Sequence, residues 1–314
     1  MFAAQWEFHC PTSHSVSRVC SMIPNPRFAN ARPEFWAYVR SLSQEIGYVE
    51  RLKRKTGTTG HVGPIKVPSP VEMKQALESI SLNADHIVDA QELPTELGRE
   101  LIDYFDYRAR VLNTVVQGQL MNADEARALF ERLQKRLKSR RPVPLNKQSK
   151  EKKKPAYLTA IVNMLIESAI EGMACDYDPR KLTTVTCDGA PIRTLARRVD
   201  GAFPSPVNPI AVWEIKEYYY TTTFGSRVAD GVYETLLDGM ELRELRTATN
   251  GANNVRHYLF VDAHYTWWIK GRSYLCRIVD MLHMGYVDEV LFGREVVDRL
   301  PAIASEWVRI ARGQ

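Results

Sequence analysis

The sequence contains no run of about 18 uncharged apolar residues, so it predicts no membrane-spanning helix. Cysteine is also scarce, with 5 scattered among 314 residues. A few scattered cysteines, odd in number, favour reduced thiols over a disulfide framework. The first residues, 1–7, lack the basic start and apolar run of a secretory signal. These absences exclude a disulfide-stapled secreted module, and we expect a cytoplasmic protein that does not bind membranes.

One nucleotide-binding motif and one hydrolase motif are missing as well. The sequence has no G-x-x-x-x-G-K-[ST] phosphate loop and no G-x-S-x-G nucleophile motif. What is present is the composition of an ordinary globular protein, 45% hydrophobic and 25% charged.

Positive charge is concentrated in one segment. The net charge of the chain is only +5, but residues 132–154 hold eleven basic side chains and a single acidic one, Glu151. The rest of the chain is therefore net acidic, and a basic block of this kind is typical of contact with a polyanion such as nucleic acid. A solvated linker is the alternative. On the first interpretation, the expected nucleic-acid contacts in this block are Arg140, Arg141, Lys152 and Lys153.

The hydrophobic periodicity changes along the chain and predicts two parts. Residues 1–139 read as a mainly helical region with a possible role in DNA recognition, 140–155 as a basic linker, and 156–314 as a second domain. In the helical region, the capping boxes Ser69-Pro70-Val71-Glu72 and Asn122-Ala123-Asp124-Glu125 predict two helix starts.

After the linker, helical and strand patterns alternate. We expect helices at 157–173, 225–242, 273–284 and 296–310, and strands at 182–187, 192–199, 210–216 and 257–261, with a short apolar run at 290–292. The Asp188-Gly189 dipeptide predicts a hairpin turn. The predicted fold class is therefore α/β (α+β), a mixed central sheet flanked by helices, with an N-terminal helical region.

The predicted strand 210–216 carries two charges in apolar surroundings. Glu214 and Lys216 are two residues apart, so their side chains leave the same face of the strand. Burial of such a pair is costly unless the charges pair or meet a metal. Asp200 ends the preceding predicted strand, and if the two strands pair, its carboxylate converges with that of Glu214. Two carboxylates suit a hard divalent cation such as Mg²⁺. A buried ion pair in a non-catalytic sheet is the alternative interpretation.

Asp200 followed by Glu214-Ile215-Lys216 resembles the PD-(D/E)XK nuclease superfamily, the restriction-endonuclease-like fold. Its core order of helix, three-stranded meander, helix and strand matches the order expected over 157–261. The resemblance implies a metal-dependent endonuclease in which Asp200 and Glu214 bind Mg²⁺, with Mn²⁺ as a possible substitute, and Lys216 positions the attacking water. Glu167, on the first core helix, would be a third catalytic carboxylate. The proline that commonly precedes the aspartate is Val199 here.

The resemblance also implies a biological setting. It points to a type II restriction-like or phage-defence nuclease that acts on double-stranded DNA, works as a homodimer and has a possible cognate methyltransferase. Immediately after the motif, residues 217–227 are rich in hydroxyl groups and end in an arginine, which suits phosphate contact. The expected contacts there are Tyr218, Thr222, Ser226 and Arg227.

Two other functions remain open from the sequence. The same site could act on RNA or branched DNA, although no recognised RNA-binding module is present. Alternatively, the chain could be a non-catalytic DNA-binding protein on a degenerate nuclease fold, although Asp200, Glu214 and Lys216 are all retained.

Overall fold

The centre of the protein is a four-stranded mixed sheet. The computed structural model describes residues 22–29, 31–50, 63–145, 154–220 and 225–313. The strands of this sheet are β3 (Gly201–Phe203), β4 (Ala211–Glu217), β5 (Arg256–Asp262) and β6 (Glu289–Phe292), in that spatial order. β3 runs antiparallel to β4, whereas β4, β5 and β6 are mutually parallel. β4 therefore lies inside the sheet, paired on both edges.

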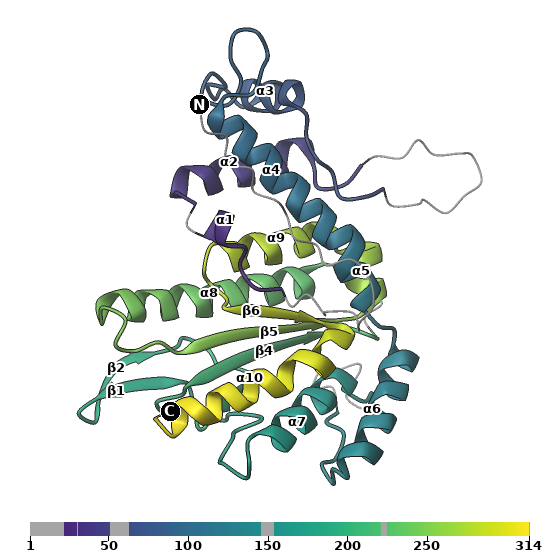
Figure 1. The fold of residues 1–314 in the computed structure, drawn as a ribbon, viewed down its shortest axis with the longest axis vertical. Coiled ribbons are helices and arrows are strands. Elements are labelled where there is room, and N and C mark those ends of the chain that lie inside the picture. Colours follow the sequence, from purple (N-terminus) through teal and green to yellow (C-terminus); the bar gives the residue numbers. More distant parts are fainter. Residues whose placement is uncertain (1–21, 30, 51–62, 146–153, 221–224, 314) are drawn as a thin grey trace, which may run out of the picture.

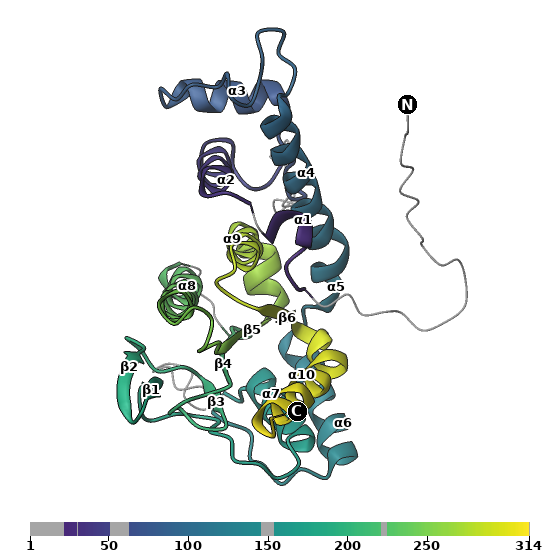
Figure 2. The same cartoon turned by 60° about the vertical axis from the view of Figure 1, so that its left-hand side comes forward.

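Helices cover both faces of the sheet (Figures 1 and 2). One face packs against α6 (Ala123–Leu137), α7 (Tyr157–Ala169) and α10 (Val296–Ala311), and the other against α8 (Ser226–Ala248) and α9 (Arg272–His283). Trp213 of β4 faces the first group, with its ring stacked on Trp307 at 5.5 Å. Because side chains alternate along a strand, Glu214 and Lys216 face α8 instead. The expected mixed α/β architecture, a mixed sheet flanked by helices, is confirmed.

The N-terminal part is a helical layer with its own core. Its helices are α1 (Pro26–Ala29), α2 (Pro33–Ile46), α3 (Pro70–Ser79) and α4 (Glu96–Val111), followed by a π-helical turn (Leu112–Val116) and α5 (Gln117–Gln119). The end of α4 and the π-helical turn pack into the same apolar cluster as α9, which joins this layer to the sheet (Figure 1). Both predicted capping boxes are confirmed, at Ser69/Glu72 for α3 and at Asn122/Glu125 for α6.

Helix α6 differs from its expected place. The basic linker that follows α6 in the sequence predicts that this helix belongs to the N-terminal region. In the structure its apolar side chains, among them Phe130 and Leu133, share one hydrophobic core with α7 and α10. The amphipathic stripe of α6 thus finds its apolar partner beyond the linker, a long-range pairing that sequence periodicity does not specify.

The expected three-stranded meander is divided. β1 (Thr184–Cys187) and β2 (Ala190–Thr194) form a separate two-stranded sheet whose turn, as predicted, is Asp188-Gly189, with φ of 50° and 80°. β2 ends at Thr194, earlier than expected, and Asp200 comes immediately before β3. The intervening chain leaves the sheet because Arg197 turns inward to carboxylates on α8, while the Ala196 N–H donates to Glu241.

Two short helical segments lie between the elements described above: a π-helical segment (Tyr265–Lys270) before α9 and a 3₁₀ turn (Gly293–Glu295) before α10. Among the helices of the described residues, none is both long enough and apolar enough to cross a membrane.

Gly201 makes the close approach of β3 to β4 possible. A Cβ atom at this position would lie 2.0 Å from the Trp213 indole ring. We expect Gly201→Ala to lower the free energy of unfolding by about 1–3 kcal/mol or more, because the indole must leave its stack on Trp307. Urea unfolding measures this change. Gly118→Ala, where a Cβ meets no atom within 4 Å, is the matched control. An equal effect of the two substitutions would contradict the steric argument.

Candidate functional site

The predicted motif lies at a pocket between β4, α7 and α8. The pocket has a volume of about 640 Å³. Asp200, Lys216 and the following Glu217 line it, and α8 forms one wall. The other polar lining residues are Arg141, Thr159, Asn163, Tyr177, Asp178, Arg197, Tyr218, Arg227, Asp230 and Glu234. We call this the β4–α8 pocket.

Asp200 is held against β4 by backbone hydrogen bonds. Its N–H donates to the Trp213 carbonyl at 3.1 Å, and its Oδ2 accepts from the Ile215 N–H at 2.8 Å. The residue as a whole keeps some solvent-exposed surface, but its carboxyl group is buried. This burial, followed by the nearby charge of Glu214, raises the pKa of Asp200 to about 6. The pairing of β3 with β4 thus places the Asp200 carboxylate on the backbone of Ile215, the residue next to Glu214.

Glu214 and Lys216 form a buried ion pair on the α8 face of β4. Lys216 Nζ lies 2.7 Å from Glu214 Oε2 and 3.1 Å from Glu234 Oε2. Burial alone would lower the pKa of Lys216, but the charges of Glu214 and Asp200 outweigh it and raise the pKa. Burial likewise acts to raise the pKa of Glu214, and Lys216 and Arg197 outweigh it and lower the pKa. Lys216 is therefore an ammonium ion, a donor and a positive charge rather than a base.

Arg197 is the site residue that sequence reasoning missed. It reaches three carboxylates, lying 3.0 Å from Glu214 Oε1, 3.3 Å from Glu234 Oε2 and 2.5 Å from Asp238 Oδ2. Burial, followed by the Glu214 charge, raises the pKa of Asp238 to about 7. In the sequence, Arg197 falls within a predicted strand next to Arg198. No local pattern distinguishes it as the residue that turns toward α8.

Glu217 lines the β4–α8 pocket where β4 meets the start of α7. Its carboxylate accepts hydrogen bonds from the Leu158 N–H at 2.9 Å and the Thr159 hydroxyl at 2.7 Å, at the N-terminus of α7. Burial raises the pKa of Glu217 to about 7 despite these bonds. This carboxylate fixes the start of α7 relative to β4.

The structure does not bring Glu167 into the pocket. Its carboxylate lies 2.8 Å from Arg141 Nε and accepts from the Ser139 hydroxyl at 3.3 Å. Asn163, one turn earlier on α7, lines the pocket instead. Its buried Oδ1 finds no hydrogen-bond partner among the described residues.

The expected nucleic-acid contacts are distributed unevenly. Arg227, Tyr218 and Arg141 line the β4–α8 pocket, whereas Arg140 is exposed outside it. Ser226 is the first residue of α8, beside Arg227. The Tyr218 hydroxyl donates to the Arg227 carbonyl at 3.3 Å. Thr222, Lys152 and Lys153 lie outside the described residues.

Few carboxylates of the β4–α8 pocket are placed to bind a metal ion. Within the described ranges, no group of three or more His, Cys, Asp or Glu side chains is arranged to hold a metal ion. A protein site for Mg²⁺ often supplies only one or two carboxylates and leaves the remaining positions to water. Asp200 and Glu214 meet that smaller requirement. The buried Glu214 Oε1 lies in an ion pair with Arg197 but accepts no hydrogen bond.

Fold and site together define a mixed α/β protein with a charged pocket at the carboxyl end of its inner strand β4. The chain matches two family models, both described as domains of unknown function: DUF7690 over residues 22–115 and DUF7687 over residues 121–307. The second match covers more than half of the chain, which therefore belongs to the DUF7687 family. It begins just before α6, the helix that shares the core of the sheet domain. No curated protein and no solved structure matches the chain.

Proposed function

We propose that this protein is a Mg²⁺-dependent nuclease that hydrolyses phosphodiester bonds in DNA at the β4–α8 pocket. The observation that carries the proposal is that Asp200 and Lys216 line one pocket, with Arg227 and Arg141 on its walls. The buried Glu214 lies directly behind them, 2.7 Å from Lys216 Nζ. Two carboxylates, an ammonium group and two guanidinium groups match the needs of phosphodiester hydrolysis, which are a cation site and positive charge for the phosphate.

Each group has a defined part in this proposal. Asp200 and Glu214 would hold the Mg²⁺ ion, which when bound supplies Lewis-acid stabilisation of the phosphate charge. Lys216, charged and fixed at 2.7 Å from Glu214, would orient a water molecule and offset negative charge on the phosphate. Arg227 and Arg141 would hold the backbone of the strand that is cut.

The order α7, β1, β2, β3, β4, α8, β5 supports a restriction-endonuclease-like domain, although the hairpin β1–β2 stands apart from the main sheet. On this basis we propose a type II restriction-like or phage-defence enzyme acting in the cytoplasm. Double-stranded DNA would be its substrate, a second copy of the chain its partner and a methyltransferase a possible companion. RNA or branched DNA would fit the same chemistry, so these substrates belong in the same assay.

A second candidate function is nucleic-acid binding without catalysis. It is favoured by the ion pairs of Glu214, whose charge Lys216 and Arg197 already balance without a metal. In this case the basic residues of the pocket would hold nucleic acid whether or not a divalent cation is present.

Plasmid cleavage separates the two functions. We expect supercoiled plasmid and linear phage DNA to be cut with Mg²⁺ and not with chelator, and Asp200→Asn to reduce the rate by about 100-fold or more. Asp230→Asn, in the same pocket but outside the motif, is the matched control and should retain the activity. Discrete fragments would indicate a sequence-specific enzyme. If the wild type binds DNA equally with and without Mg²⁺ and never cuts it, the nuclease proposal is wrong.

A further inference from the structure

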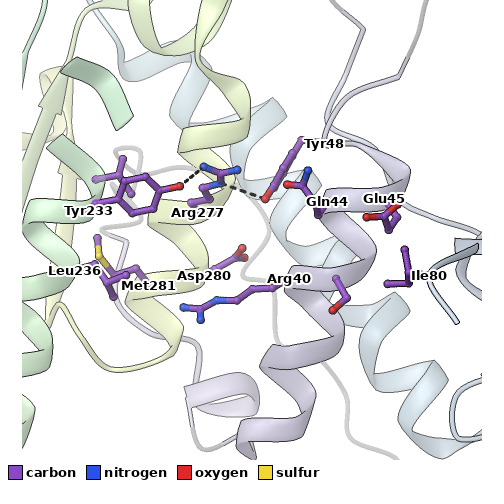
Figure 3. Close-up of a pocket in the computed structure, with 12 residues that line it drawn as sticks. Arg40, Gln44, Glu45, Tyr48, Ile80, Tyr233, Leu236, Arg277, Asp280 and Met281 are labelled. Atoms are coloured by element: carbon purple, nitrogen blue, oxygen red, sulfur yellow. Dashed lines mark hydrogen bonds between the residues drawn. The ribbon is translucent and has the colours of Figure 1, made fainter. Parts of the chain in front are cut away.

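A second pocket lies on the opposite side of α8, where the N-terminal helices meet the sheet domain. It has a volume of about 530 Å³, within the range of small-molecule sites of roughly 300–1,000 Å³. Figure 3 shows its walls, which come from α2 and Tyr48 just after it, from the end of α3, from α8 and from α9. We call it the α2–α9 pocket. Segments of both family matches line it, because α2 belongs to residues 22–115 and α8 and α9 belong to 121–307.

Arg277 spans this pocket between two tyrosines. Its Nη1 donates to the Tyr233 hydroxyl at 2.7 Å and its Nε donates to the Tyr48 hydroxyl at 3.2 Å, as drawn in Figure 3. Its guanidinium carbon also lies 5.5 Å from the Tyr48 ring centre and 5.1 Å from that of Tyr274. The guanidinium is thus fixed in position by aromatic groups.

A second guanidinium enters from α2. Arg40 extends toward α9 in Figure 3, and its Nη2 donates to the weak acceptor Sδ of Met284, at 3.4 Å. Among the described residues, neither Arg40 nor Arg277 has a carboxylate within 4.0 Å. The carboxylate of Asp280, at the floor, is committed to the buried Arg108. Glu45 is the remaining acid of the lining, so positive charge predominates in the pocket.

The rest of the lining is apolar and aromatic. Val232 and Leu236 of α8 and Met281 of α9 form one side, and Ile80 closes the other. The Tyr233 side chain remains half exposed, with its ring beside the pocket. A flat apolar ring fits between such side chains, and an anionic group attached to it fits the two guanidinium groups.

We propose that the α2–α9 pocket binds a small nucleoside phosphate. The base would lie against Tyr233, Leu236 and Met281, and the phosphate would take charge-assisted hydrogen bonds from Arg277 and Arg40. Phosphate favours a pair of guanidinium groups because arginine donors match its oxygen geometry. The proposal does not depend on nuclease activity, because the β4–α8 pocket is lined by other residues of α8.

Calorimetric titration of the full chain in the presence of chelator tests this proposal. The probes are AMP and GMP, with adenosine and inorganic phosphate as the two halves of the ligand. We expect one saturable site per chain for AMP or GMP, and affinity at least about 10-fold lower for each half. Arg40→Gln and Arg277→Gln should each weaken nucleotide binding by about 10-fold or more.

Arg227→Gln, an arginine of the β4–α8 pocket, is the matched control and should leave the affinity unchanged. Thermal unfolding of each variant confirms that it is folded; Arg40 is exposed, so its substitution keeps the test valid if Arg277→Gln fails to fold. The proposal is overturned if neither nucleotide binds, if phosphate alone binds as tightly as AMP or GMP, or if Arg227→Gln rather than Arg40→Gln removes binding.

Discussion

Replacement of Lys216 with methionine is expected to reduce Mg²⁺-dependent DNA cleavage by about 100-fold or more. Methionine keeps the length and apolar stem of the side chain but removes the ammonium group, which lies 2.7 Å from Glu214 and 3.1 Å from Glu234. Lys216 is the lysine among the described residues that line the pocket, so without its charge none of them supplies an ammonium group to orient water or offset charge on the phosphate. The measurement is the initial rate of plasmid nicking at fixed Mg²⁺.

Loss of activity through unfolding has to be separated from loss of chemistry. In the variant, Glu214 stays buried with Arg197 as its remaining cationic partner, so we expect stability to fall by about 1–3 kcal/mol. Assays well below the melting temperature, with DNA binding measured in parallel, separate the two effects. Lys181→Met, at an exposed lysine, is the control and should leave both quantities unchanged. If Lys216→Met cuts DNA within a few-fold of the wild-type rate, Lys216 has no part in the reaction.

The parts of this fold that sequence could predict are those determined by neighbouring residues. Ser69 and Asn122 mark helix starts because a cap and its partner lie three residues apart, so local chemistry alone places them. The turn at Asp188-Gly189 is equally local, since both residues take positive φ. Placement of Glu214 and Lys216 on one face follows from the period of a strand.

The parts that sequence could not predict depend on distant partners. Arg197 reaches Glu214 and Asp238, which are 17 and 41 residues away, and no spacing rule connects them. Glu167 and Asn163 share a face of α7, but Arg141 pairs with Glu167 and leaves Asn163 at the pocket. The α2–α9 pocket forms only where two separate parts of the chain meet.

The second large effect is expected at the buried ion pair between α4 and α9. Asp280 accepts from Arg108 Nη1 at 2.9 Å and from the Tyr104 hydroxyl at 2.6 Å. Both ionic side chains are buried, at 2% and 8% exposure. Asp280→Asn keeps the shape but leaves Arg108 as an uncompensated charge, so we expect the free energy of unfolding to fall by about 3–5 kcal/mol. Urea unfolding, followed by tryptophan fluorescence, measures the change.

Two further variants make this prediction specific to the buried charge. Asp103, like Arg108, lies on α4 and forms an exposed ion pair with Arg27 of α1. Asp103→Asn removes this pair and should lower the free energy of unfolding by no more than about 1 kcal/mol. The double variant Arg108→Met/Asp280→Leu removes both charges and should recover part of the lost stability, because no buried charge is left without a partner. The recovery is partial because the buried Tyr104 hydroxyl loses its acceptor. Because the pair joins the N-terminal helices to the sheet domain, the single variant should also unfold in two steps, the helical layer first. A single transition, with a cost equal to that of Asp103→Asn, would show that the buried pair does not hold the two parts together.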